Sequence, residues 1–268
     1  MGIPRDLLRQ HPGVEQWAIL AGYRGSVAHG MYVPPKNPLS IDDKDVMAIC
    51  VPPPVYYLGL KQYGSRGTEE IKRNEWDIVV YECRKAMSML AQGNPNMLSI
   101  LWLSDKHYIK RTAAGQLILS HRALFSGRHV YNSFVGYAKG QLHRMTHGSF
   151  DGYMGEKRKA LVEKFGYDTK NAAHLIRLLR MGIEFLKDGT LYVERMDAQE
   201  LLEIKHGEWA LEKVKQESDR LFSVAQEAYL RSTLPIEADR EAIDWLCADV
   251  VRTAWQERDE RTTEMAGL

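Results

Sequence analysis

Three aspartates stand at the starts of two apolar segments of this 268-residue chain. Asp43 and Asp45 lie two residues apart in IDDKDVMAICV, and Asp77 begins DIVVY. Side chains at positions i and i+2 of a strand point to the same face, so Asp43 and Asp45 can act together. Mg²⁺ prefers oxygen ligands and often keeps coordination positions for phosphates. The pattern indicates a magnesium site, which Asp77 completes if its strand pairs beside the first.

An Asp-x-Asp pattern alone is weak, because most copies are turn or capping carboxylates. A glycine-serine turn upstream, Gly25 and Ser26, strengthens it. The backbone N–H groups of such a turn and the serine hydroxyl can bind a terminal phosphate. Two metal ions about 4 Å apart can activate an attacking hydroxyl and stabilise a leaving pyrophosphate. A metal-dependent nuclease also uses acidic clusters, but the glycine-serine turn suits a terminal phosphate better than strand cleavage.

A second candidate group lies in GYDTKNAAHLIRLLRMGIEFLKDG, which has helical periodicity. Lys170, His174 and Arg177 stand at i, i+4 and i+7 and form one polar stripe on this helix. Most charged stripes are simply solvated faces. Lysine, arginine and histidine on such a face can also bind the β- and γ-phosphates of a nucleotide. The residues alone leave both interpretations open.

The elements that would position these residues fall into two groups. Strands are predicted over 45–51 and 75–82, followed by a helix that Gly93 closes. Helical periodicity dominates afterwards, and it predicts helices over 123–147, 157–166, 168–189, 197–230 and 240–260. The chain therefore reads as an α/β (α+β) protein, with one domain over 1–125 and a helical domain over 126–268.

The composition is that of a globular protein, with 44% hydrophobic and 26% charged residues. No apolar run approaches the roughly 20 residues of a membrane-spanning helix. The three isolated cysteines favour a reducing compartment, so we expect a cytoplasmic protein without membrane partners. Residues 107–187 hold 14 Lys and Arg against 5 Asp and Glu, and residues 188–268 hold 10 against 19. The basic segment either faces phosphates or is neutralised by the acidic one.

Several motifs together resemble the DNA polymerase β-like nucleotidyltransferase superfamily. The similarity is closest to the branch of predicted nucleotidyltransferases associated with RNA-repair gene clusters, which shows GSxAxG, Asp-x-Asp, an Asp-led strand before LRKAL, and NPxxLE. The counterparts here are GSVAHG, DKD, WDIVVYECRKAMSML and NPNMLSILW, and the resemblance spans about residues 20 to 210. Two departures concern PPKNP at 34–38, which resembles an insertion, and Ser99, where a glutamate is common.

The resemblance implies a mixed catalytic sheet followed by helices, and a role for each candidate residue. Asp43, Asp45 and Asp77 would bind catalytic magnesium, or manganese in its place, and Asp77 would be the base for the incoming hydroxyl. Gly25 and Ser26 would bind the nucleoside triphosphate (ATP or another) together with Lys170, His174 and Arg177.

The implied reaction moves a nucleoside monophosphate from the triphosphate to an acceptor hydroxyl and releases pyrophosphate. RNA or DNA is the favoured acceptor because of the basic segment, although a protein or small molecule would serve the same chemistry. The alternative is a non-catalytic nucleotide- or nucleic-acid-binding module on the same fold, such as a regulator or an antitoxin.

Overall fold

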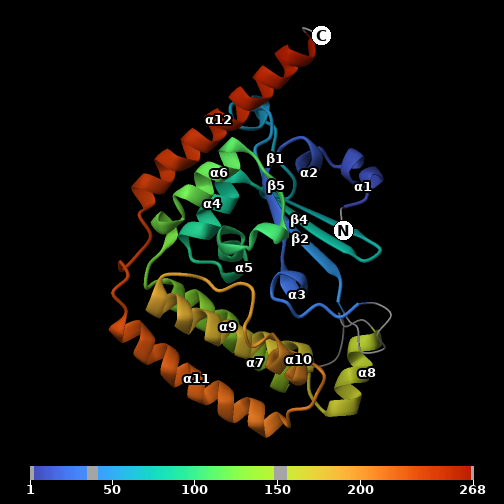
Figure 1. Cartoon of the computed structure of the whole chain (residues 1–268), viewed down its shortest axis with the longest axis vertical. Coiled ribbons are helices and arrows are strands. Elements are labelled where there is room, and N and C mark those ends of the chain that lie inside the picture. Colours follow the sequence, from blue (N-terminus) through green and yellow to red (C-terminus); the bar gives the residue numbers. More distant parts are fainter. Residues whose placement is uncertain (1–2, 35–41, 148–155, 267–268) are drawn as a thin grey trace.

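A five-stranded mixed sheet forms the N-terminal part of the computed structural model, which describes residues 3–34, 42–147 and 156–266 (Figure 1). The strands run in the order β3-β4-β2-β1-β5. The central strands β2 and β4 are parallel, and the other neighbours are antiparallel. The strands are β1 (Ala18–Tyr23), β2 (Lys44–Cys50), β3 (Thr68–Arg73), β4 (Trp76–Glu82) and β5 (Tyr108–Arg111).

Strand β2 is buried on both faces, as its apolar sequence predicts. Met47 and Ile49 belong to the large core under the helices, whereas Val46 and Ala48 belong to a smaller core on the opposite face. Asp45 shares the parity of Met47 and Ile49, so its side chain lies on the face that the large helical core covers.

Helices cover both faces of the sheet (Figure 1). The smaller core is closed by the N-terminal segment with α1 (Arg5–Gln10) and α2 (Pro12–Glu15). On the other face lie α4 (Cys83–Ala91), α6 (Ala113–Ser120) and the last helix, α12 (Arg240–Ala266), which packs against both. The short elements are α3 (Gly25–Ala28), α5 (Pro95–Leu98) and the 3₁₀ turns Pro54–Tyr56, Ser99–Trp102, Asp105–His107 and Arg122–Phe125.

Helix α9 (Thr169–Asp188) is the centre of the helical part and packs against its neighbours α7, α10 and α11. Asp168 caps its first turn by accepting a hydrogen bond from the Asn171 N–H at 3.0 Å, and Gly189 ends it in the left-handed region at φ 65°. The other helices here are α7 (Val130–His147), α8 (Glu156–Phe165), α10 (Ala198–Lys205) and α11 (Leu211–Arg231).

The mixed sheet followed by helices confirms the predicted fold class. Three features differ from the sequence prediction. The polar edge strand β3 and the short β5 were not foreseen, and the helix predicted over 197–230 is divided between α10 and α11, near Gly207 at φ 80°. The PPKNP segment lies almost entirely outside the described residues.

The predicted boundary near residue 125 stays a prediction. Buried residues of the sheet unit and of the helices form one continuous core, and α12 returns to the sheet unit to pack against α4 and α6. No helix within the described residues combines the length and apolar character needed to cross a bilayer.

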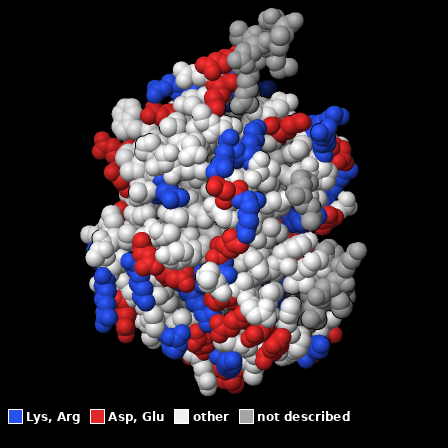
Figure 2. Space-filling view, in the orientation of Figure 1, with Lys and Arg blue, Asp and Glu red and all other residues white. Residues whose placement is uncertain are grey.

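Acidic and basic segments do meet in the folded chain. Arg180 of α9 pairs with Asp197 at 2.7 Å, with Glu200 at 2.6 Å and with Glu217 at 3.3 Å. Part of the basic surplus in α9 is therefore neutralised by the acidic α10 and α11, and mixed charges cover the surface seen in Figure 2.

Candidate active site

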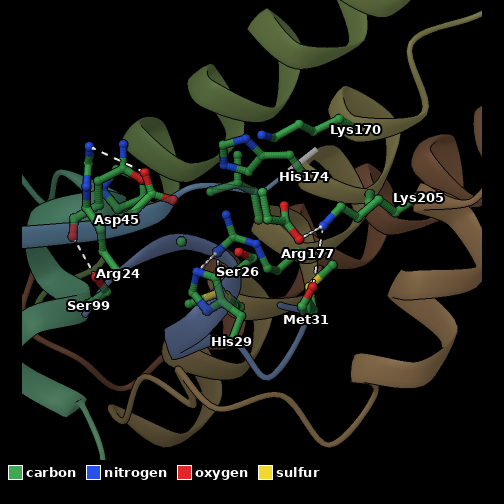
Figure 3. A pocket seen from close by; sticks show the side chains of 17 residues that line it. Arg24, Ser26, His29, Met31, Asp45, Ser99, Lys170, His174, Arg177 and Lys205 are labelled. Atoms are coloured by element: carbon green, nitrogen blue, oxygen red, sulfur yellow. Dashed lines mark hydrogen bonds and ion pairs between the residues drawn. The ribbon is translucent and has the colours of Figure 1, made fainter. Parts of the chain in front are cut away.

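A cavity of about 280 Å³ lies where the start of β2 and the α3 turn face α9 and α10 (Figure 3). Asp45 lies at one end beside Arg24, and Lys170, His174, Arg177 and Lys205 lie farther along the cavity. Its polar lining comes from residues far apart in sequence: Arg24, Gly25, Ser26, His29, Asp42, Asp45, Asn96, Ser99, Lys170, His174, Arg177 and Lys205. This volume is near the lower end of the range of small-ligand sites.

The parallel pairing of β2 and β4 brings two of the predicted metal ligands together. Asp45 and Asp77 are direct partners in the register, so their side chains stand on the same face of neighbouring strands. Asp43 precedes β2 and is exposed, and its charge adds to the negative field at Asp45. Burial raises the pKa of Asp45 to about 6, against the opposing effect of Arg24 and with a further rise from Asp77. Of the three aspartates, Asp45 lines the cavity.

These carboxylates fit one mode of magnesium binding. Among the described residues, no group of three or more His, Cys, Asp and Glu side chains is arranged to hold a metal ion. Mg²⁺, however, is often bound through one or two carboxylates, with waters and substrate phosphates completing its shell. The neighbouring pair Asp45 and Asp77 suits an ion that takes its remaining ligands from a phosphate substrate.

The glycine-serine turn approaches this carboxylate pair closely. Gly25 has φ 60°, and a Cβ at this position would lie 2.2 Å from Oδ2 of Asp45. Only glycine therefore allows the turn to pack against the carboxylate. The Oγ of Ser26 is buried and has no hydrogen-bond partner among the described residues, although it belongs to a residue that lines the cavity. A buried hydroxyl without a partner is costly, so a ligand oxygen would stabilise it.

All three predicted basic residues of α9 line the cavity, but Arg177 is buried, not solvated as a surface stripe would be. Its Nη1 lies 2.6 Å from Nε2 of His29, whose Nδ1 lies 2.8 Å from the Val193 carbonyl. Because a carbonyl only accepts, Nδ1 carries the proton and the Nε2 lone pair accepts from Arg177. Burial, followed by the charge of Arg177, lowers the pKa of His29 well below 6.5 and keeps the ring neutral.

Arg177 is thus a buried cation whose hydrogen-bond partners are neutral. Burial and the nearby Arg195 lower its pKa to about 9, and Asp197 partly opposes them. No described carboxylate lies within ion-pair distance of Arg177, whereas Arg180, one turn further, has three. An unbalanced buried cation beside a cavity favours an anionic ligand.

A structural ion pair also lines the cavity. Nζ of Lys205 on α10 lies 2.5 Å from Oδ2 of Asp42, and the same oxygen accepts from the Val33 N–H at 3.0 Å. Both side chains are almost completely buried. The pair ties the helical part to the segment that leads into β2, so it helps to hold the aspartates against α9.

Sequence reasoning overlooked Arg24 and Lys205, which line this cavity. Arg24 directly precedes the glycine-serine turn, a position that could have drawn attention to it. Lys205 has no local signal, because its partner is 163 residues away. Ser99 stands where the resembling family commonly has a glutamate; its Oγ donates to the Asn96 carbonyl at 2.6 Å and adds no charge to the cavity.

Comparison with known proteins agrees with the motifs and the geometry. None of the curated proteins compared with the chain matches it significantly. Residues 8–249 match the family model described as RlaP: RNA repair pathway DNA polymerase beta family. The match includes the strands, the glycine-serine turn, the aspartates and helix α9. The chain therefore belongs to the RlaP family of polymerase β-like proteins of RNA repair.

Proposed function

We propose that this protein is a magnesium-dependent nucleotidyltransferase that moves a nucleoside monophosphate from a triphosphate to an acceptor hydroxyl, with RNA or DNA as the favoured acceptor. The observation that carries the proposal is the cavity itself, because it joins Asp45, beside Asp77, to a wall with Ser26, Lys170 and Arg177. The carboxylates can bind a divalent cation, and the serine and basic side chains can bind phosphates.

The chain's own residues have distinct tasks in this reaction. Lys170 and Arg177 bind the β- and γ-phosphates, His174 donates a hydrogen bond to a phosphate oxygen, and the Ser26 hydroxyl binds a terminal oxygen. Asp77 accepts the proton of the acceptor hydroxyl. The acceptor oxygen bonds to the α-phosphorus, and the bond to the β-phosphate oxygen breaks with its electron pair leaving on pyrophosphate.

Magnesium, or manganese, would be held by Asp45 and Asp77, with Asp43 beside them, and would supply positive charge to the transferring phosphoryl group. Catalysis in such a site consists mainly of positioning and charge stabilisation.

The test uses triphosphates labelled at the α-phosphate, each with Mg²⁺ and total RNA, DNA or protein. Transfer of label to one acceptor class, lost in Asp45→Ala, supports the proposal. Glu75→Gln is the control, since Glu75 is an exposed carboxylate just before β4, the neighbour of β2, and pairs with Lys44. Its transfer rate should equal that of the wild type.

Two outcomes contradict the proposal. Transfer of a γ-label to the acceptor would mean phosphoryl transfer instead. Tight triphosphate binding with no transfer to any acceptor would favour a binding module.

A further inference from the structure

The guanidinium of Arg24 lies beside the two carboxylates that the proposed metal would bind. Its Nη2 is 3.5 Å from Oδ1 of Asp77 and 3.9 Å from Oδ1 of Asp45. Figure 3 shows Arg24 and Asp45 together at the carboxylate end of the cavity, with Arg177 farther along. Arg24 therefore balances part of the negative charge at this end of the cavity.

This pairing is loose for an arginine. Arg180 and Arg195 hold their carboxylates with hydrogen bonds as short as 2.6 and 2.5 Å, respectively. Arg24 makes one contact at the limit of hydrogen bonding, and its buried Nε has no partner among the described residues. The planar guanidinium has five donors in a fork that matches phosphate oxygens. Arg24 thus has donors available at the cavity for an anion besides the two aspartates.

The backbone of Arg24 is held in place. Its N–H donates to the Asp45 carbonyl at 2.9 Å, and Gly25 follows it in the tight turn. Only the side chain can exchange partners. An ion bound to both Asp45 and Asp77 at about 2 Å from their oxygens would occupy space next to the guanidinium and repel it. A divalent ion entering alone must therefore displace Arg24 from its partners.

Building on the proposed transferase function, we infer that Arg24 is a phosphate-binding residue that pairs with Asp45 and Asp77 until substrate enters. The triphosphate gives its guanidinium a new partner at the α-phosphate, next to the metal. Binding of the divalent ion and binding of the triphosphate consequently assist each other through this one side chain.

The experiment measures Mn²⁺ affinity by electron paramagnetic resonance, with and without an α,β-methylene nucleoside triphosphate, which cannot transfer its nucleotidyl group. Arg24→Gln should bind Mn²⁺ alone about 10-fold more tightly than the wild type, because the competing cation is gone. The factor by which the triphosphate raises Mn²⁺ affinity should fall about 10-fold, because the guanidinium no longer moves to the phosphate.

Lys72→Gln is the matched control. Lys72 also lies near Asp77, at 3.8 Å, but is 59% exposed and does not line the cavity. Its removal should change Mn²⁺ affinity about 2-fold at most and leave the coupling factor unchanged. Arg24→Lys keeps the charge but not the fork, so it should retain weak Mn²⁺ binding alone and lose most of the coupling. If Arg24→Gln fails to fold, the coupling factor measured for Arg24→Lys tests the inference instead.

The outcomes separate this inference from the proposed function. If the factor by which the triphosphate raises Mn²⁺ affinity is unchanged in Arg24→Gln, the role of Arg24 is overturned and the transferase proposal stands. If Arg24→Gln is unfolded, the same result in Arg24→Lys has the same meaning. A wild-type protein that binds neither Mn²⁺ nor the triphosphate would overturn both.

Discussion

Replacing Gly25 by alanine should abolish the proposed nucleotidyl transfer by displacing one carboxylate. The added Cβ would lie 2.2 Å from Oδ2 of Asp45, and real Cβ contacts below 3.0 Å essentially do not occur. The carboxylate must therefore move by about 1 Å away from the turn, and so out of its position beside Asp77. Alanine also fits poorly at φ 60°, which costs about 1–2 kcal/mol of folding stability.

Gly30→Ala separates these two effects. Gly30 has φ 72°, so alanine is strained there as well, but the nearest atom to its Cβ is that of Ala198 at an ordinary 3.7 Å. Both variants should lose about 2–8 °C of melting temperature. Only Gly25→Ala should lose about 100-fold in label transfer, the cost expected when a reacting group is misplaced by about 1 Å.

The assay compares transfer of α-labelled nucleotide at a temperature where both variants are folded, with melting followed by circular dichroism. Equal transfer rates in the two variants, at similar melting temperatures, would refute the conclusion that Gly25 is required for the position of Asp45.

Three further predictions concern the charges around the cavity. Because burial and then Arg177 lower the pKa of His29, the unfolded chain takes up a proton below pH 6.5 that the folded chain does not. Stability is therefore complete above pH 6.5 and falls as the pH drops below it; in urea titrations His29→Gln should show a shallower fall than the wild type. Lys205→Met should lower the free energy of unfolding by about 3–5 kcal/mol, since it leaves Asp42 buried and unpaired. Adding Asp42→Asn should recover much of this loss, because asparagine still accepts from the Val33 N–H. Arg177→Met should raise the melting temperature of the ligand-free protein, because it removes a buried cation whose pKa is lowered to about 9, and should weaken triphosphate binding measured by calorimetry. A lower melting temperature would contradict that reasoning.

Features with a local cause were predictable from the sequence. The apolar residues on both faces of β2 and β4 marked them as internal strands, and internal strands that begin with aspartates bring those aspartates together when they pair in parallel. That the two strands pair in this way was the condition of the prediction, and the structure has Asp45 and Asp77 as direct partners in the register. The polar stripe on α9 was equally local, since residues at i, i+4 and i+7 share a helix face whatever surrounds the helix.

Features decided by packing left no trace in the sequence. The edge strand β3 is largely polar, so its sequence lacks the alternation of apolar residues that indicates a strand. It is a strand because it pairs with β4. Between α10 and α11, Gly207 has φ 80° and packs so closely on the ring of Phe165 that a Cβ there would lie 2.4 Å from it, and Phe165 is distant in the sequence. Whether Arg177 is solvated or buried depends on His29 and on the segment that includes Val193, which approach it from distant parts of the chain.

The charges in this one cavity are of two kinds, and the difference bears on function. Asp42 and Lys205 are buried but paired at 2.5 Å, so each neutralises the other without a ligand. Asp45 is partly exposed and only loosely paired with Arg24 at 3.9 Å, and Arg177 is buried without a carboxylate at ion-pair distance among the described residues. The pKa values of both are displaced toward the neutral forms, to about 6 and about 9. Asp45 and Arg177 do not contact each other, so neither lowers the free-energy cost of the other's charge, in contrast to Asp42 and Lys205. In a metal-triphosphate complex the divalent cation stabilises the charge of Asp45 and the phosphates stabilise the charge of Arg177. The metal alone or the triphosphate alone stabilises only one of the two charges. The cavity should therefore bind a metal-triphosphate complex in preference to either component.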